Sequence, residues 1–141
     1  MNKILSTLTG NQVDDPKSVI DQGFVGISAA TAGCLIRTNM VHSICDGTVI
    51  ATGIDPLNNT WTVTVEATSQ MWIRYCLLLE DDLPAVGQKI KESDYIGVAH
   101  KKLMRLEYCT SAKSQFPVRE LNKQLYKHDP SAIIFGGIPN A

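Results

Sequence analysis

Residues 46–53 read Asp-Gly-Thr-Val-Ile-Ala-Thr-Gly, and residues 61–66 read Trp-Thr-Val-Thr-Val-Glu. Both segments are rich in β-branched side chains, and apolar and polar residues alternate in the second, as in a strand with one buried face. The turn-forming residues 55–59, Asp-Pro-Leu-Asn-Asn, separate the two segments. Because similar strand and turn signals recur on both sides, residues 23–110 are predicted to form one mainly β domain.

The segments outside this domain have a different character. Residues 1–22 are polar and are expected to form an N-terminal arm or a short helix. Residues 117–127 begin with a proline and place Leu121 and Leu125 on one helical face, which predicts an amphipathic helix. Residues 111–141 are therefore expected to form a C-terminal helix followed by an apolar tail.

The C-terminal segment also suggests a way to contact other proteins. An apolar stripe at helical spacing is normally part of a core, but an arm and an apolar tail together give a small domain two means of docking into an assembly. We therefore expect partner subunits to bind through both ends of the chain. The candidate docking residues are Leu121, Leu125, Ile133, Ile134 and Phe135.

Composition limits the classes of function. The chain has 141 residues, the size of one domain, and 44% of them are hydrophobic, enough for a single core. A formal net charge of -1 gives no overall attraction to nucleic acid. The first ten residues lack the continuous apolar stretch of a signal peptide, and no segment has the roughly 18 apolar residues that span a bilayer. We expect neither export, nor a membrane span, nor a nucleic-acid partner.

The cysteines do not form a recognisable metal or redox motif. Cys34, Cys45, Cys76 and Cys109 stand singly, without a Cys-x-x-Cys pair, and are expected to be buried thiols. A zinc site that joins His42 and Cys45 to Cys76 or Cys109 is the less favoured alternative.

A series of short motifs resembles the lysostaphin-type zinc peptidase family over residues 23–108. Residues 46–53 are similar to its turn-and-strand element, and residues 86–91, Val-Gly-Gln-Lys-Ile-Lys, to its Val-Gly-Asp-x-Val hairpin. Residues 103–108, Leu-Met-Arg-Leu-Glu-Tyr, are similar to its His-Leu-His-Phe-Glu-Val signature. The resemblance implies a barrel-sandwich-like antiparallel β domain, with the short C-terminal helix added.

Other residues occupy the family's metal-ligand and catalytic positions. In Phe24-Val25-Gly26-Ile27-Ser28, which fits the family's His-x-Gly-Val/Ile-Asp frame, Phe24 stands for the histidine and Ser28 for the aspartate. Leu103 and Arg105 replace the histidines of the last motif, and Leu77 falls at the catalytic histidine of the Tyr-Ala-His-Leu segment. A permanently protonated arginine repels a divalent cation. The resemblance therefore implies no zinc, no other cofactor and a pseudoenzyme.

For Arg105 itself two roles stay open. It lies on a solvated strand face or pairs with Glu107, or it forms a salt bridge that holds the former cleft shut.

Two functions from different classes follow. The first is a non-catalytic structural or assembly subunit of a phage-type particle, in the tail tip or baseplate hub, which would place the chain in a virion. The alternative is a biotinyl- or lipoyl-like carrier or adaptor in the cytoplasm, although residues 66–71 offer no lysine for attachment. A groove that still binds glycan or peptide could be lined by Trp61, Trp72 and Tyr75, but core packing is favoured for these aromatic residues.

Overall fold

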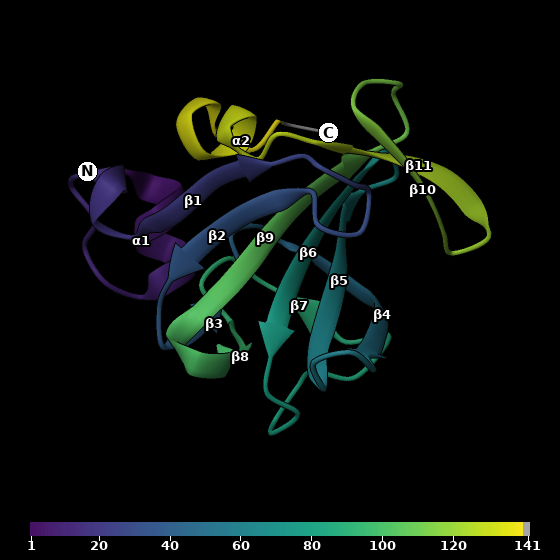
Figure 1. Cartoon of the computed structure of the whole chain (residues 1–141). Helices are drawn as coiled ribbons and strands as arrows, with labels where there is room; N and C mark the ends of the chain where they lie inside the picture. Colours follow the sequence, from purple (N-terminus) through teal and green to yellow (C-terminus); the bar gives the residue numbers. More distant parts are fainter. Residues whose placement is uncertain (140–141) are drawn as a thin grey trace.

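The computed structural model describes residues 1–139 and consists mainly of β-strands (Figure 1). Its elements are, in chain order, α1 (Lys3–Thr9), the 3-10 helix η1 (Pro16–Ser18), β1 (Ile20–Val25), β2 (Gly33–Arg37), β3 (Met40–His42), β4 (Gly47–Asp55), β5 (Thr60–Thr68), β6 (Met71–Leu78), β7 (Lys89–Ile90), β8 (Tyr95–Val98), the 3-10 helix η2 (His100–Lys102), β9 (Leu103–Thr110), β10 (Phe116–Glu120), β11 (Lys123–His128) and α2 (Ser131–Gly136).

The strands form one large antiparallel sheet and one small one. The large sheet has nine strands, with the order β1-β2-β9-β6-β5-β4-β7 and the β10–β11 hairpin attached to β9 through β11. Strands β3 and β8 form the second sheet. The expected mainly β antiparallel fold with a short C-terminal helix is therefore confirmed. In the β4–β5 hairpin, Asn59 has φ 57°, a left-handed conformation that asparagine tolerates better than most residues.

The amphipathic helix predicted for residues 117–127 is wrong. This segment forms the β10–β11 hairpin, in which Val118 pairs with Leu125. The turn residues Leu121 and Asn122 both have positive φ, 55° and 59°, as in the hairpin turns whose twist matches that of the strands. β11 also gains a partner in β9, because His128 pairs with Tyr108. Pairing with an available sheet edge has overridden the local helical pattern.

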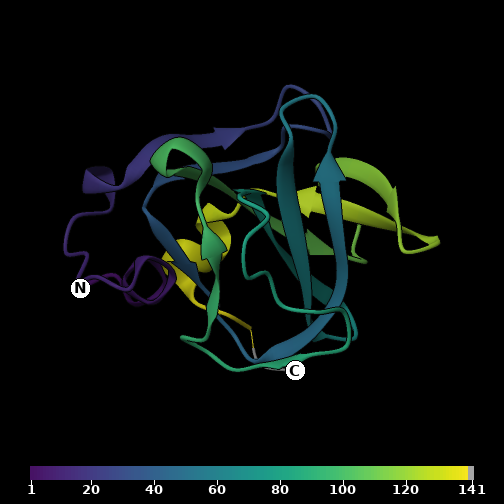
Figure 2. The ribbon, with the colours of Figure 1, turned by 90° about the horizontal axis from the view of Figure 1, so that it is seen from below.

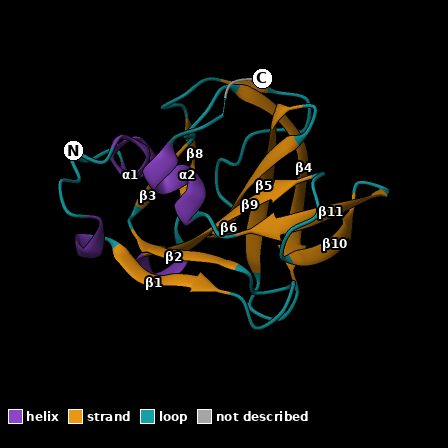
Figure 3. Ribbon diagram, turned by 90° about the horizontal axis from the view of Figure 1, so that it is seen from above, coloured by secondary structure: helices purple, strands orange, loops and turns teal. Residues whose placement is uncertain are grey.

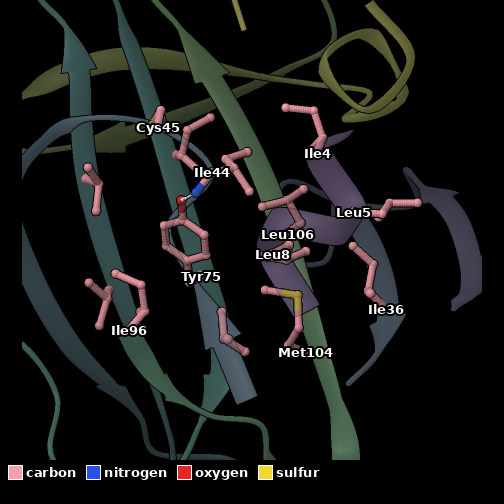
Figure 4. Packing of buried hydrophobic residues seen from close by; sticks show 14 of the residues in the cluster. Ile4, Leu5, Leu8, Ile36, Ile44, Cys45, Tyr75, Ile96, Met104 and Leu106 are labelled. Carbon is pink, nitrogen blue, oxygen red and sulfur yellow. Dashed lines mark hydrogen bonds between the residues drawn. The ribbon is translucent and has the colours of Figure 1, made fainter. Parts of the chain in front are cut away.

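The N-terminal segment is not a free arm. Asn2 caps the N-terminus of α1, because its side chain accepts a hydrogen bond from the backbone N–H of Leu5. The side chains of Leu5 and Leu8 in α1 are fully buried. They join the main core with Tyr75 and Leu106 (Figure 4). Residues 1–22 thus contribute to the same core as the β domain.

The two ends of the chain meet. Asn2 Nδ2 donates to the carbonyl oxygen of Ile134, 3.0 Å away. Figures 2 and 3 show α1 and α2 side by side, and Figure 3 shows them on the side of the molecule away from the tip of the β10–β11 hairpin. In α2, the side chains of Ile133 and Ile134 are buried, whereas that of Phe135 is exposed. The last two residues of the expected apolar tail, 140 and 141, lie outside the described residues.

None of the helices within residues 1–139 is long and apolar enough to cross a membrane.

One buried hydroxyl links the main sheet to the chain that enters β4. Tyr75 is fully buried, and its hydroxyl oxygen accepts a hydrogen bond from the backbone N–H of Ile44 at 3.0 Å (Figure 4). Ser43 Oγ lies 3.3 Å from the same oxygen and donates to the carbonyl oxygen of Cys45.

We predict that Tyr75→Phe lowers the free energy of unfolding by about 1–3 kcal/mol, because the buried N–H of Ile44 loses its acceptor. Urea unfolding followed by fluorescence measures the change. Tyr126→Phe is the matched control, since its hydroxyl makes no hydrogen bond to any described residue. Equal losses in the two variants would contradict the assigned role of Tyr75.

Candidate functional site

The candidate site lies on the face of the sheet opposite the main core. Side chains alternate between the two faces of a strand. Tyr75 in β6 and Leu106 in β9 point into the core, so Arg74 and Glu107, which pair across these strands, share the other face. Arg105 lies two residues before Glu107 and is on that face too. The strands therefore carry an apolar face and a charged face.

The carboxylate of Glu107 is the centre of the charged face. Its side chain has 0% exposure, yet three cations contact it. Arg74 Nη1 lies 2.6 Å from Oε1, Lys127 Nζ lies 2.9 Å from the same oxygen, and Arg105 Nε lies 2.7 Å from Oε2. Arg74 Nη1 also lies 2.9 Å from Glu120 Oε1. Three cations thus share two carboxylates and leave one positive charge in excess.

These cations keep Glu107 ionised. Burial by itself would raise the pKa of its carboxyl group, but Arg74, Lys127 and Arg105 together hold that pKa below its ordinary value. Arg74 and Arg105 donate hydrogen bonds to the ionised carboxylate, and Lys127 forms an ion pair with it, so the buried charge is compensated.

Lys127 extends the network to the loop between β1 and β2. Its Nζ also donates to the carbonyl oxygen of Ala29. Ser28 stands in the same loop, is exposed, and hydrogen bonds through its Oγ to Thr31 Oγ1 at 3.0 Å. The loop is thus fixed to the charged face by its backbone rather than by the Ser28 side chain.

A groove of about 640 Å³ opens above this network. Arg74, Arg105 and Lys127 contribute to its lining, with Glu120 beside them. Its remaining walls come from the β1–β2 loop, the β4–β5 hairpin and strand β10. The wall residues are Ala29, Ala30, Ala51, Thr52, Gly53, Ile54, Asp55, Pro56, Thr62, Thr64, Pro117, Val118 and Arg119.

The residues at the expected ligand positions are only partly brought together. Leu103 and Arg105 lie on β9, and Arg105 pairs with Cys76 on β6, next to Leu77. Phe24 lies on β1, which β2 separates from β9, and its ring packs against Phe116 at a centroid distance of 6.1 Å. Of the two roles considered for Arg105, pairing with Glu107 is the one observed.

Leu77 occupies a strained backbone position. Its φ is 67°, in the left-handed region that costs a residue with a Cβ about 1–2 kcal/mol. The register between β5 and β6 shifts beside it, between Trp61 and Val63. The backbone irregularity at the expected catalytic position is therefore a local bulge of strand β6.

These residues do not fit a zinc ion. Phe24, Leu103 and Arg105 offer no metal donor, and the hydroxyl of Ser28 is bonded to Thr31. Within residues 1–139, no group of three or more histidine, cysteine, aspartate and glutamate side chains could hold a metal ion. The cysteines are buried free thiols, and burial raises the pKa of Cys45 to about 11 and that of Cys109 to about 12. A joint zinc site with His42 is not formed.

The aromatic residues considered for a ligand groove pack in cores instead. Tyr75 is fully buried, and Trp61 packs against the same core. Trp72 is buried with Cys109 and Leu125 in a second cluster, under the β10–β11 hairpin. Its Nε1 donates to Glu66 Oε2 at 3.0 Å, and Lys123 Nζ lies 4.5 Å from its ring centroid.

Sequence reasoning missed Arg74, Lys127 and Glu120 as parts of the charged face. One signal was present: Arg74 interrupts the otherwise apolar segment 71–79, and an unshielded charge in a buried strand needs a partner. Lys127 and Glu120 carried no such signal, because their segment was assigned to a helix.

Comparison with solved structures identifies the fold. The chain is similar to a zinc-containing peptidase from Vibrio cholerae, with 24% identity and a TM-score of 0.53 over 63% of this chain and 32% of that one. It is also similar to the catalytic domain of the prophage-encoded M23 protein EnpA from Enterococcus faecalis, with 14% identity and a TM-score of 0.51 over 79% of this chain and 85% of that one. Lysostaphin matches with 15% identity and a TM-score of 0.56 over 82% of this chain and 49% of that one.

No protein-family model matches the chain, and no curated protein does. The chain spans about a third of the Vibrio cholerae peptidase and about half of lysostaphin. Identities this low show the fold alone, and that fold is the lysostaphin-type M23 peptidase fold.

The expectation that the chain is not an enzyme is contradicted by these comparisons. The structures that share its fold include a zinc-containing peptidase, the catalytic domain of an M23 protein and lysostaphin.

The lowered pKa of Glu107 predicts sensitivity to acid. Because the folded pKa lies below the ordinary value of 4.5, the unfolded chain binds the proton more tightly than the folded one. The stabilisation is fully present above the ordinary pKa and is lost as the pH falls through the lower folded value. The free energy of unfolding, measured in urea from about pH 7 to about pH 3, should therefore fall more steeply in the wild type than in Glu107→Gln.

The exposed Glu92→Gln controls for general effects of a lost carboxylate. Its curve should follow the wild type. Parallel curves for the wild type and Glu107→Gln would show that this carboxylate does not titrate as described.

Proposed function

We propose that this chain is a structural subunit of a larger protein assembly and that it binds a partner in the groove above Glu107. The observation that carries the proposal is a groove of about 640 Å³ whose floor holds fixed cations. Side chains that are already immobilised lose little conformational entropy when a partner binds. A groove whose charged side chains are already held in place is therefore suited to binding a partner protein.

The surroundings of the groove support a protein partner. Ile54 of β4 lines it and is 48% exposed, and Leu57, in the turn between β4 and β5, is 95% exposed. Ile27, in the loop that Lys127 fixes, is 84% exposed. Exposed large apolar side chains that gather on one surface mark sites of protein interaction.

The contact surface differs from the one expected from the sequence. Leu125, Ile133 and Ile134 are buried within the chain and cannot reach a partner without unfolding. Leu121 and Phe135 are exposed and remain available as a secondary contact.

For the biological setting, we propose a phage-type particle, with the chain in the tail tip or baseplate hub. The sequence resemblance suggests this setting, and a prophage-encoded M23 protein is among the proteins with a similar fold. The carrier alternative has less support, because the β5–β6 turn, Ser69–Gln70, offers no lysine for a prosthetic group.

The test is the size of the species that contains the chain in its native cells. A tagged chain should sediment in a density gradient with a particle far larger than its own 15.4 kDa. Leu57→Glu should reduce the fraction in the particle, because it places a charge beside the groove. Val86→Glu is the control, since Val86 is 61% exposed but does not line the groove. Sedimentation only as a free monomer would refute the proposal.

A further inference from the structure

The hydrogen-bonding capacity of Arg105 is only partly used. Its Nε donates to Glu107, while its two terminal nitrogens make no hydrogen bond with any described residue. Within residues 1–139, every buried side-chain nitrogen or oxygen has a hydrogen-bond partner. The two terminal nitrogens of Arg105 have none, so they are accessible to solvent. Arg105 lines the groove, with 18% of its side chain exposed. A guanidinium with both terminal nitrogens free can bind a planar anion with two parallel hydrogen bonds.

The position of Arg105 is fixed on two sides. Glu107 holds its Nε at 2.7 Å. Its aliphatic part packs on Gly33 of β2, where a Cβ would come within 2.7 Å of the Arg105 Cγ. Glycine at position 33 therefore leaves the space in which the Arg105 side chain lies. The guanidinium is held before any ligand arrives.

The charge balance favours a single anionic group. Arg74, Arg105 and Lys127 exceed Glu107 and Glu120 by one positive charge. In the rest of the lining, the cation of Arg119 is offset by the carboxylate of Asp55. A run of phosphates, as in nucleic acid, would need several unpaired cations.

The walls select the type of anion. Thr62 and Thr64 present hydroxyl groups, and Ile54 and Val118 present apolar surface close to the charged floor. A carboxylate carried on a polypeptide combines one planar anion with amide and apolar groups, and so matches all three features of the lining.

We propose that the groove binds an acidic side chain of a partner polypeptide through its carboxylate, on the terminal nitrogens of Arg105. The inference rests on the proposed function, because it names the chemistry of the partner in the same groove.

The test is a nuclear magnetic resonance titration with two matched probes. Acetyl-Leu-Glu-Leu-amide should shift the Arg105 Nε–H resonance and the backbone amides of Thr62 and Thr64 in a saturable way. Acetyl-Leu-Gln-Leu-amide, without the charge, should bind at least about tenfold more weakly. Because both titrations use the unaltered chain, folding of a variant does not affect the result.

Variants then locate the site. Arg105→Lys keeps the charge but removes the paired nitrogens, and should weaken binding of the acidic peptide about tenfold. Arg37→Lys is the matched control, because Arg37 pairs with Asp21 and does not line the groove. It should leave the affinity unchanged.

Three results would overturn the inference. They are equal binding of the two peptides, equal affinity in Arg105→Lys, and shifts as large with inorganic phosphate as with the acidic peptide. If the acidic peptide causes no saturable shift of the Arg105 Nε–H resonance, the inference is overturned as well. If these occur while the chain still sediments with a large particle, the assembly role stands and the carboxylate site fails. Specific peptide binding by a chain that is always a free monomer would support the carboxylate site and refute the assembly role.

Discussion

The buried carboxylate of Glu107 is the constraint on which the charged half of the structure depends. Removing a carboxylate from water costs several kcal/mol unless cations and hydrogen bonds replace the solvent. Those cations come from three strands: Arg74 from β6, Arg105 from β9 and Lys127 from β11. Satisfying one acidic group thus fixes the C-terminal hairpin against the sheet. Lys127, which pairs with Glu107, also donates to the carbonyl oxygen of Ala29 and so fixes the β1–β2 loop. The groove has its shape because these segments meet at Glu107.

The two faces of the sheet make this arrangement specific. In β6, Arg74 on the charged face is followed by Tyr75 in the core, and in β9, Leu106 in the core is followed by Glu107. A slip of one residue in either strand would place a charge in the main core and a large apolar side chain in the groove. The core face and the charged face of the sheet therefore both favour the observed register of β6 and β9. The strain at Leu77 and the shift beside it occur only at the end of β6, beyond the residues that hold the network.

Strand patterns in the sequence were sufficient to predict the centre of the fold. Residues 46–66 carry two β-rich segments and a turn, and they form β4 and β5. The spacing of Arg105 and Glu107 allowed their pairing to be considered. The hairpin at 116–128 could not be seen in the same way, because Val118 and Leu125 fit a helical face as well as a strand pair. What decides between them is long-range: β11 pairs with β9, and Lys127 reaches Glu107.

Local sequence patterns also did not predict how the two terminal segments, α1 and α2, pack. The apolar residues of α1 are few, yet Leu5 and Leu8 are fully buried because the sheet and α2 provide a surface for them. In the same way, Ile133 and Ile134 look like an exposed tail in the sequence and are covered in the fold. Short segments of this kind take their structure from tertiary contacts rather than from their own propensity.

A double-mutant cycle between Arg105 and Glu107 tests the central claim most directly. Arg105→Gln, Glu107→Gln and the double variant would each be unfolded in urea at neutral pH, beside the wild type. If the buried carboxylate organises its cations, the effects are not additive, and the coupling free energy is about 1–3 kcal/mol. Additive effects, with a coupling of about zero, would contradict the account, because they would show that Arg105 and Glu107 contribute independently to stability.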